Sequence, residues 1–286
     1  MEKIGLVLEG GGMRGAYSAG VLYWLLENEM YFDYVVGISS GALYAGMYVL
    51  DKKDALKGAA IDVAADSRNV GLKPILHERT VVGYEFLYKE VTENLDYPLE
   101  LIDQIPGEIE IGVYDIEGEE TVWKNKHDIA RCPKYIQAAC TLPVAGRRVH
   151  LEGKDYMDGG ITTMIPVSRS IEYGCTKHMI ITTKSKDYVR KPQGFFMRLL
   201  LNTVYRKYPK LIQDFENRVN VYYDERKQID ELVAAGDAVY MYPSKELGVS
   251  RYSGTKEQFT ELFEIAQADC EARRDEIEKL YHSVKG

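Results

Sequence analysis

The sequence is poor in cysteine and histidine. Its four cysteines, Cys132, Cys140, Cys175 and Cys270, are scattered and include no Cys-x-x-Cys pair. That spacing excludes a disulfide framework and a zinc knuckle, so we expect reduced thiols, as in a cytoplasm. The five histidines include none in a turn motif that would indicate a catalytic loop.

The sequence also lacks long apolar runs and an excess of positive charge. No stretch approaches the roughly 18 uninterrupted apolar residues of a membrane span, and residues 1–8 have neither the charge nor the length of a signal peptide. The 36 Lys and Arg against 44 Asp and Glu leave a net charge of −8, which excludes a basic nucleic-acid binder because phosphate contacts need clustered cations. We expect a soluble, cytoplasmic protein, with any membrane contact peripheral at the inner membrane face.

What the chain does contain is the composition of a globular protein, 45% hydrophobic and 28% charged. Near the N-terminus, residues 4–8 and 34–38 are continuous apolar runs typical of strands buried on both faces. Between them, residues 15–28 carry apolar side chains at helical spacing. Two such strands joined by a helix form a βαβ unit, which predicts an α/β fold with a parallel sheet and a right-handed crossover.

The rest of the chain divides near Lys184. Before it we expect helices over 54–67, 128–140 and 167–173, a cap or lid over 69–106, a hairpin of 109–114 with 121–124, an extended segment over 148–156 and a strand over 179–182. After it we expect helices over 196–207, 209–232 and 255–281 and a strand over 238–242. We therefore predict a catalytic core over 1–183 and an extension over 184–286 that is mainly helical with one strand.

A glycine loop follows the first predicted strand, and its residues 10–15 read Gly-Gly-Gly-Met-Arg-Gly. This matches the dinucleotide fingerprint G-x-G-x-x-G, but that fingerprint needs an acidic residue at the end of the second strand. Here Asp33 precedes that strand and Ser39 ends it. Alternatively, the free amides of the loop, next to a helix N-terminus, form an oxyanion hole. A tight strand-to-helix turn without chemistry is the third reading.

A candidate nucleophile follows the second predicted strand. Residues 37–41 read Gly-Ile-Ser-Ser-Gly, the G-x-S-x-G pattern of a nucleophile elbow, at a strand end directly before a helix. Gly37 and Gly41 allow a sharp reversal that exposes the Ser39 hydroxyl. Ser40 lies off the centre of the glycine pair, and we expect it to cap the helix.

An activated serine needs a base, and the histidines offer none in a suitable motif. A Ser–Asp–His triad on an α/β-hydrolase sheet is also disfavoured because Ser39 follows only the second strand. Asp158 is the better candidate, because Gly159 and Gly160 after it permit close backbone approach. A carboxylate next to a serine hydroxyl can accept its proton if burial raises the carboxyl pKa. Taken alone, Asp-Gly-Gly could also be a simple turn.

Together these segments resemble the patatin-like phospholipase family in four blocks over residues 4–183. The glycine loop is similar to the family's G-G-G-x-R/K-G loop, and residues 37–41 to its G-x-S-x-G elbow. Residues 138–143, Ala-Ala-Cys-Thr-Leu-Pro, are similar to its alanine-serine block ending in proline, and residues 158–160 to its D-G-G/A block. One departure is Cys140, where the family often has serine or another small residue.

The resemblance implies a three-layer α/β/α fold with a mostly parallel central sheet and a C-terminal helical extension. It implies a serine lipid acyl hydrolase that cleaves fatty-acyl esters, with Ser39 as nucleophile and Asp158 as general base. The amides of Gly11, Gly12 and Met13 become the oxyanion donors, with the remaining motif residues in support: Gly10, Arg14, Gly15, Gly37, Gly41, Gly159 and Gly160. It implies no metal and no organic cofactor, and it leaves the oligomeric state open.

Three further hypotheses concern partners and alternatives. Lys184, Lys186, Arg190 and Lys191 beside Phe195, Phe196 and Met197 could form a basic, apolar-tipped edge for lipid headgroups, or a solvated loop whose aromatic residues enter the core. The chain could also be a patatin-like scaffold retained for binding or regulation. A dinucleotide-dependent oxidoreductase is the third alternative.

Overall fold

Five parallel strands form the centre of the computed structural model, which describes residues 2–285. They lie in the order β3 (Glu108–Asp115), β2 (Tyr34–Gly37), β1 (Ile4–Leu8), β7 (Lys177–Ile181) and β8 (Ala238–Met241). In the central register Leu6 pairs with Val35 on one side and with Met179 on the other. The apolar runs predicted as buried strands are therefore covered on both edges and both faces.

Antiparallel strands extend the sheet beyond β3. The strand β4 (Glu120–Asn125) pairs with β3, as the predicted hairpin requires. The strand β6 (Lys154–Asp158) also pairs with β3, and β5 (Val149–Leu151) pairs with β6. The predicted extended segment 148–156 is thus a hairpin, and Glu152 and Gly153 form its turn with φ values of 51° and 83°.

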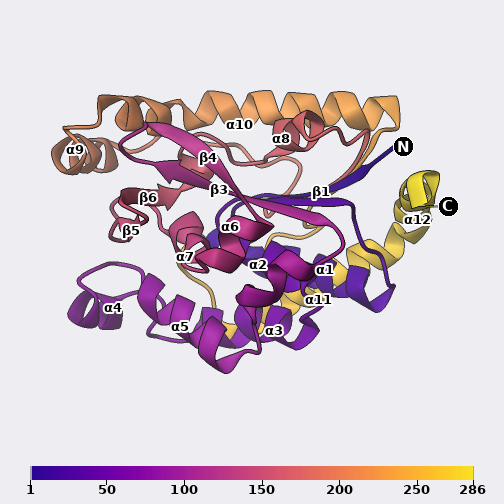
Figure 1. The fold of residues 1–286 in the computed structure, drawn as a ribbon, viewed down its shortest axis with the longest axis horizontal. Coiled ribbons are helices and arrows are strands. Elements are labelled where there is room, and N and C mark those ends of the chain that lie inside the picture. Colours follow the sequence, from indigo (N-terminus) through magenta and orange to yellow (C-terminus); the bar gives the residue numbers. More distant parts are fainter. Residues whose placement is uncertain (1, 286) are drawn as a thin grey trace.

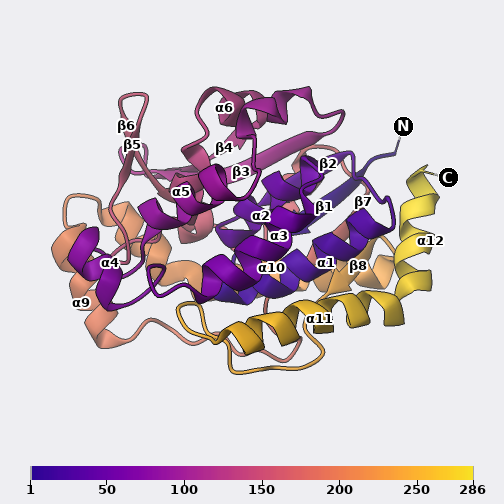
Figure 2. The ribbon, with the colours of Figure 1, turned by 90° about the horizontal axis from the view of Figure 1, so that it is seen from below.

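Helices cover both faces of this sheet (Figure 1). On one side lie α8 (Val167–Glu172) and the long α10 (Pro209–Ala235), with α9 (Phe195–Val204) at one end. On the other side lie α1 (Ala16–Glu27), α2 (Ser40–Val49), α3 (Lys53–Gly58) and α11 (Lys256–Ala272), which Figure 2 shows from below. The predicted three-layer α/β/α fold is confirmed.

The shorter elements fill the remaining parts of the chain. The π-helical η2 (Ala59–Val63) continues α3, and α4 (Leu72–His77), α5 (Tyr84–Asn94) and the 3-10 helix η3 (Leu99–Gln104) make up the segment expected as a cap. Two short 3-10 helices, η1 (Gly12–Gly15) and η4 (Gly159–Ile161), follow β1 and β6. The last helix is α12 (Arg274–Lys285).

Two predicted helices are each broken in two. The helix expected over 128–140 is α6 (Lys126–Arg131) followed by α7 (Tyr135–Cys140), because Pro133 stands between them and cannot continue the backbone ladder of α6. The helix expected over 255–281 divides at Arg273, whose guanidinium donates to the Tyr240 carbonyl on β8 at 2.6 Å. Its start was correct, because Thr255 and Gln258 form a capping box at the N-terminus of α11.

The segment after Lys184 is part of the same sheet and of both helical layers. β8 pairs in parallel with β7, α10 packs on α8 and β8, and α11 lies along α1. At the α1–α11 contact a Cβ on Gly20 would lie 2.4 Å from the Phe263 carbonyl oxygen, so the two helix backbones approach closely. The outer edge of β7 is paired only because β8 is present.

The surface of the molecule carries apolar side chains at one end. On α9, Phe195 and Phe196 are 74% and 83% exposed, with Leu199, Leu200 and Val204 also exposed. On α4, Leu72 and Leu76 are exposed, and both views place α4 and α9 at the same end of the molecule (Figures 1 and 2). Within residues 2–285, no helix combines the length and the apolarity that crossing a membrane requires.

Candidate active site

Ser39 lies in the sharp turn between β2 and α2. Its φ of 57° and ψ of −130° are a strained combination for a residue with a side chain. The turn can form because glycines stand on either side of it: a Cβ on Gly37 would lie 2.5 Å from the Gly41 carbonyl oxygen, and one on Gly41 would lie 2.7 Å from that of Leu8. The geometry is that of a nucleophile elbow.

Asp158 is brought to the same place by β6. Its side chain is 1% exposed, its Oδ1 accepts the Gly160 amide at 2.7 Å, and its own amide donates to the Thr141 carbonyl at 2.9 Å. Burial raises the pKa of the Asp158 carboxyl above its ordinary value, although hydrogen bonding to the Ser39 side chain and to the Gly160 amide opposes the rise. Within residues 2–285 its buried Oδ2 accepts no well-formed hydrogen bond. An acceptor oxygen is therefore available beside the Ser39 hydroxyl.

The glycine loop lies next to Ser39, because a Cβ on Gly10 would lie 2.7 Å from the Ser39 Cβ. The amides of the loop differ in their partners. The Gly10 amide donates to the Met164 carbonyl at 3.3 Å and the Met13 amide to the Arg251 carbonyl at 3.2 Å. The Gly11 amide donates to Ser40 Oγ at 3.0 Å. Within residues 2–285 the Gly12 amide has no acceptor. Ser40 does not cap α2, contrary to the sequence expectation, because its hydroxyl is turned toward the loop instead.

Arg251 is a neighbour of the loop that no sequence motif indicated. It lies between β8 and α11, more than 230 residues along the chain from the loop. Gly12 has a φ of +59°, and a Cβ there would lie 2.5 Å from the Arg251 carbonyl oxygen. Two separate constraints therefore require glycine at position 12. The extension reaches the candidate oxyanion loop by backbone contact.

A cavity opens at Ser39, which we call the elbow cavity. Its empty volume is about 600 Å³, part of it open to solvent. Ser39, Gly12, Met13 and Arg251 line its polar side, and the rest of the wall is mainly apolar: Leu43, Tyr44, Ala59, Ala64, Val70, Val82, Leu87 and Leu142. A second cavity of about 280 Å³ shares Leu43, Tyr84, Leu87 and Cys140 with the first and is almost wholly apolar.

Cys140 stands where the related motif has a small residue, and the structure shows what it does. Its Sγ donates to the Ser39 carbonyl at 3.3 Å, and it lines both cavities. Burial raises the pKa of its thiol well above the ordinary range. The side chain is thus a neutral, small apolar group that contacts the backbone of the elbow.

The residues on which the alternative functions depend do not line the elbow cavity. None of the five histidines lines the elbow cavity; His178 is buried on β7 against the Ser170 hydroxyl, and burial lowers its pKa to about 4. Asp33 accepts the Ile4 amide at the opposite end of β1 from the glycine loop, so it cannot hold a ribose there. Within residues 2–285, no group of His, Cys, Asp or Glu is arranged to hold a metal.

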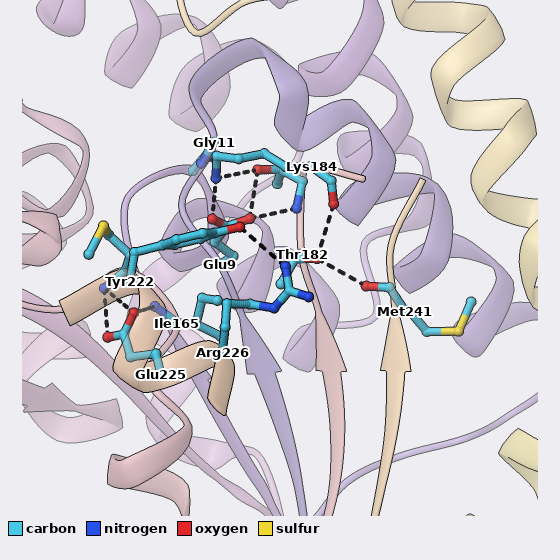
Figure 3. A network of polar contacts seen from close by, with 12 residues as sticks. Glu9, Gly11, Ile165, Thr182, Lys184, Tyr222, Glu225, Arg226 and Met241 are labelled. Carbon is cyan, nitrogen blue, oxygen red and sulfur yellow. Dashed lines mark hydrogen bonds and ion pairs between the residues drawn. The ribbon is translucent and has the colours of Figure 1, made fainter. Parts of the chain in front are cut away.

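A buried ion pair ties the glycine loop to the strand beside it. Glu9 immediately follows β1 and is fully buried, and its carboxylate accepts the amide and hydroxyl of Thr183 at 2.7 and 3.0 Å. The Lys184 ammonium pairs with the same carboxylate (Figure 3). Burial alone would raise the pKa of Glu9, but Lys184 and Thr183 outweigh it and lower the pKa. Sequence reasoning missed this pair because Glu9 and Lys184 belong to no shared motif.

Glu225 supports the glycine loop from α10, which lies on the face of the sheet opposite α1 and α2. Its carboxylate accepts the amides of Met164 and Ile165, each at 3.0 Å at the closest (Figure 3). The Met164 carbonyl in turn accepts the Gly10 amide. Burial raises the pKa of Glu225 to about 8. A side chain of the extension thereby positions the first residue of the glycine loop.

Comparison with known proteins identifies family models and relatives that match this chain. A family model described as patatin-like phospholipase matches residues 6–170, and a domain of unknown function (DUF6363) matches residues 208–282. An uncharacterized protein of Escherichia coli, YjjU, is 26% identical over an aligned length of 210 residues, and the match covers 68% of this chain and 55% of that protein. Lysophospholipase NTE1 of Kluyveromyces lactis is 23% identical over 93% of this chain and 19% of its own length.

Two further matches are narrower. A putative patatin-like phospholipase domain-containing protein of Caenorhabditis elegans is 34% identical over 28% of this chain and 7% of its own length. The solved structure of VipD from Legionella pneumophila covers 94% of this chain and 67% of that one at 12% identity, and its TM-score of 0.40 is too low to support an argument. The chain spans 55% or less of the length of these curated relatives.

The Glu9–Lys184 pair generates a stability prediction. We expect Glu9→Gln to lower the free energy of unfolding by about 3–5 kcal/mol, because it leaves the Lys184 ammonium buried without its counter-charge. The double variant Glu9→Gln with Lys184→Met should recover much of that loss, since no buried charge then remains unpaired. Chemical denaturation of each variant measures the effect.

The matched control for this cycle is the exposed pair of Lys245 and Glu261. Glu261→Gln should change stability by less than about 1 kcal/mol. If Glu9→Gln lowers the free energy of unfolding no more than Glu261→Gln does, the buried pair does not stabilise the loop.

Proposed function

Since the chain belongs to the patatin-like phospholipase family, we propose that it is a serine lipid acyl hydrolase, an esterase of the phospholipase A or lysophospholipase type. It cleaves fatty-acyl esters through a Ser39–Asp158 dyad and an acyl-enzyme. The observation that carries this proposal is the buried Asp158 carboxylate beside Ser39 at a strained elbow, with no histidine in the cavity. The Kluyveromyces relative is named a lysophospholipase, which supports the same reaction class.

The reaction follows from the two side chains. Asp158 takes the hydroxyl proton as Ser39 Oγ attacks the ester carbonyl carbon, and the carbonyl oxygen becomes an oxyanion. Collapse of this intermediate expels the alcohol, which receives the proton, and leaves the acyl group on Ser39. Asp158 then takes a proton from water as the water attacks the acyl-enzyme, and the fatty acid is released as Ser39 is restored.

The oxyanion is held by amides of the glycine loop. Of the three proposed amides, that of Gly12 is free of an acceptor within residues 2–285, so it is the first donor. The Gly11 and Met13 amides donate to Ser40 and Arg251 and must exchange those acceptors for the oxyanion. Preorganised donors of this kind typically contribute 10²–10³-fold each to the rate.

The acyl chain occupies the apolar part of the elbow cavity. That wall, formed by α2, η2, α5 and the segment after α7, continues into the second cavity through Leu43, Leu87 and Cys140. Both cavities are lined mainly by apolar side chains, as sites for hydrocarbon ligands are. This arrangement favours an ester with a fatty acyl chain over a small or polar ester.

The end of the molecule that carries the exposed apolar side chains of α9 is the surface that we assign to lipid contact. The stripe of exposed Phe195, Phe196, Leu199, Leu200 and Val204 on α9 is flanked by the exposed cations Lys191, Arg198, Arg206 and Lys207. An apolar face beside cations is typical of helices that lie on anionic membranes. Two members of the edge predicted from the sequence do not take part, because Lys184 and Arg190 are buried; the alternative of aromatic residues in the core is wrong for Phe195 and Phe196.

Labelling with a fluorophosphonate tests the nucleophile. We expect intact mass to show one adduct on the wild-type chain and none on Ser39→Ala, because only an activated serine reacts with this reagent. Ser168→Ala, at an exposed serine hydrogen-bonded to Gln228, is the matched control and should label fully. A folded wild-type chain without an adduct would favour the non-catalytic scaffold.

The pH dependence of labelling tests the base. The raised pKa of Asp158 means that the carboxyl is protonated, and unable to accept a proton, to a higher pH than an ordinary aspartate of pKa 3.8. We therefore expect the labelling rate to rise with pH through one ionisation above that value and then to level off. Asp158→Asn should lose the reaction at every pH, and a rate that stays high in this variant would rule out the dyad.

Vesicle sedimentation tests the membrane surface. We expect Phe196→Gln combined with Phe195→Gln to reduce binding to vesicles of phosphatidylcholine and phosphatidylglycerol by about tenfold or more, because two exposed aromatic side chains no longer enter the interface. Val233→Gln, an exposed apolar position on α10, is the control. Equal binding by all three proteins would show that α9 does not contact lipid.

A further inference from the structure

A further cavity, which we call the basic groove, adjoins the elbow cavity at Tyr84, whose side chain lines both. Its empty volume is about 1170 Å³, part of it open to solvent. Four of its lining side chains are cations, Arg79, Lys134, Arg147 and Arg148, and two are carboxylates. The chain as a whole has the opposite balance, with 36 Lys and Arg against 44 Asp and Glu. A cleft lined mainly by one sign of charge attracts ions of the other sign.

Backbone hydrogen bonds bring two of these cations together. Arg79 follows α4, and Arg147 precedes β5. Between them, the Val81 and Val82 amides both donate to the Ala145 carbonyl, at 3.1 and 3.2 Å. Arg79 and Arg147 each stand two residues from this contact and both line the basic groove. The two loops therefore hold their guanidinium groups at the same cavity.

Three of the four cations are unpaired. Within residues 2–285, the side chains of Arg79, Lys134 and Arg147 form no ion pair with a carboxylate and donate no hydrogen bond, whereas Arg148 pairs with Asp155 at 2.9 Å. All three unpaired side chains are exposed. Their N–H donors are therefore available to a ligand in the groove.

The two carboxylates of the groove have other partners. Glu78 accepts the Phe86 amide at 2.9 Å and the Glu85 amide at 3.2 Å. Glu85 in turn accepts the Gln137 side-chain amide at 3.0 Å and lies 3.6 Å from the Lys89 ammonium. Neither carboxylate forms an ion pair with a cation of the groove among residues 2–285. The excess of positive charge in the groove is thus not cancelled by direct pairing.

Arg79 has a backbone conformation that a residue with a Cβ ordinarily avoids. Its φ is 57°, in the left-handed region that Gly and Asn adopt most readily. As described above, its side chain gives the fold no ion pair or hydrogen bond that would offset this conformation. Residues held in such conformations cluster at ligand sites. The backbone of Arg79 thus points to a ligand as well as its charge does.

The basic groove is separate from the candidate active site. Tyr84 is 8% exposed, and a Cβ on Gly146 would lie 2.5 Å from its Cδ2, so its ring is packed closely against the next loop. Its hydroxyl accepts the Leu142 amide at 3.3 Å. Ser39 does not line the groove. A group bound in the basic groove is therefore held apart from the ester bond proposed to react at Ser39.

We propose that Arg79, Lys134 and Arg147 form a binding site for a phosphate monoester group. Near neutral pH such a group carries close to two negative charges and presents three acceptor oxygens. A phosphodiester has a single charge and two free oxygens, so it matches three unpaired cations less well. Charge-assisted hydrogen bonds from Arg to phosphate are among the stronger ones in proteins. The site does not depend on the hydrolase function proposed above.

The phosphate monoester has two sources, a soluble phosphorylated molecule or the headgroup of a membrane lipid. The groove is open to solvent, which admits the first source. It also lies between α4 and β5, and both views place these elements at the same end of the molecule as α9 (Figures 1 and 2). A headgroup in a bilayer that contacts α9 is therefore within reach of the groove. The experiments separate the two sources.

The first experiment measures the binding of methyl phosphate and dimethyl phosphate by isothermal titration calorimetry at a fixed ionic strength. We expect methyl phosphate to bind at least about tenfold more tightly, because the diester lacks one charge and one acceptor oxygen. The double variant Arg79→Gln with Arg147→Gln should weaken the binding of methyl phosphate by about tenfold or more. Arg206→Gln, at an exposed arginine outside the groove, is the matched control and should bind like the wild type.

The arginine variants are expected to fold, because Arg79 and Arg147 are both exposed. Thermal unfolding without ligand checks this. Binding of methyl phosphate that the double variant leaves unchanged would overturn the assignment of these residues.

The second experiment measures vesicle sedimentation in the Ser39→Ala background, so that hydrolysis does not alter the lipid. Phosphatidylcholine vesicles contain either phosphatidic acid, whose headgroup is a phosphate monoester, or phosphatidylglycerol, a diester, at matched zeta potential. If the source is a lipid headgroup, we expect a preference for phosphatidic acid that Arg79→Gln with Arg147→Gln abolishes. Phe195→Gln with Phe196→Gln is the control, because it should weaken binding to both vesicles and keep the preference.

The two experiments together decide the source and the site. Tighter binding of methyl phosphate without a preference for phosphatidic acid would identify a soluble phosphate monoester as the ligand. A preference for phosphatidic acid that depends on the two arginines would identify a lipid headgroup. No discrimination between monoester and diester in either experiment would overturn the proposed site, whatever fluorophosphonate labelling shows for Ser39.

Discussion

The buried contact of Glu9 with Thr183 and Lys184 is the interaction on which the candidate site depends. Glu9 stands at the point where β1 ends and the glycine loop begins, and Thr183 and Lys184 stand where β7 has just ended. The carboxyl ends of two neighbouring parallel strands are therefore joined by a fully desolvated ion pair. Such a pair is costly to break and contributes little to net stability, so its effect is to fix where the loop lies.

The extension takes part in the site and does not merely cover it. β8 completes the parallel sheet, Glu225 on α10 positions Met164 and through it Gly10, and the Arg251 carbonyl accepts the Met13 amide. The same region also supplies Arg190 and Arg218, which are both buried. The role proposed for the glycine loop requires rigidity, because reorganisation of oxyanion donors during a reaction would cost the rate that they provide. Contacts from both faces of the sheet provide that rigidity here.

The elbow cavity combines two environments, one apolar and one polar. Its apolar wall of α2, η2 and α5 continues into a second apolar cavity, while its polar side holds Ser39, the glycine loop and Arg251. Asp158 lies beside Ser39, where burial raises the pKa of its carboxyl and hydrogen bonding to the Ser39 side chain and to the Gly160 amide opposes the rise. The balance of these effects sets the pH above which the carboxyl is ionised.

The sequence by itself determined the local elements and the motif positions. The apolar runs of residues 4–8 and 34–38, the glycines around Ser39 and the Asp-Gly-Gly turn are short-range patterns, and steric rules that act over a few residues are sufficient to interpret them. The α/β class followed from the same patterns. Where a local pattern was ambiguous the predictions failed, as at Pro133, at Arg273 and at Ser40.

Only the tertiary structure decided which distant residues meet. The Glu9–Lys184 pair joins segments 175 residues apart, and the contact of Arg251 with Met13 joins segments more than 230 residues apart. A charged residue in a sequence is ordinarily solvated, and nothing in its neighbours reveals that Lys184, Arg190 and Arg218 are buried. Burial and pairing arise when β8 and α10 complete the sheet, because packing of whole elements, and not local spacing, determines which charges lose their water.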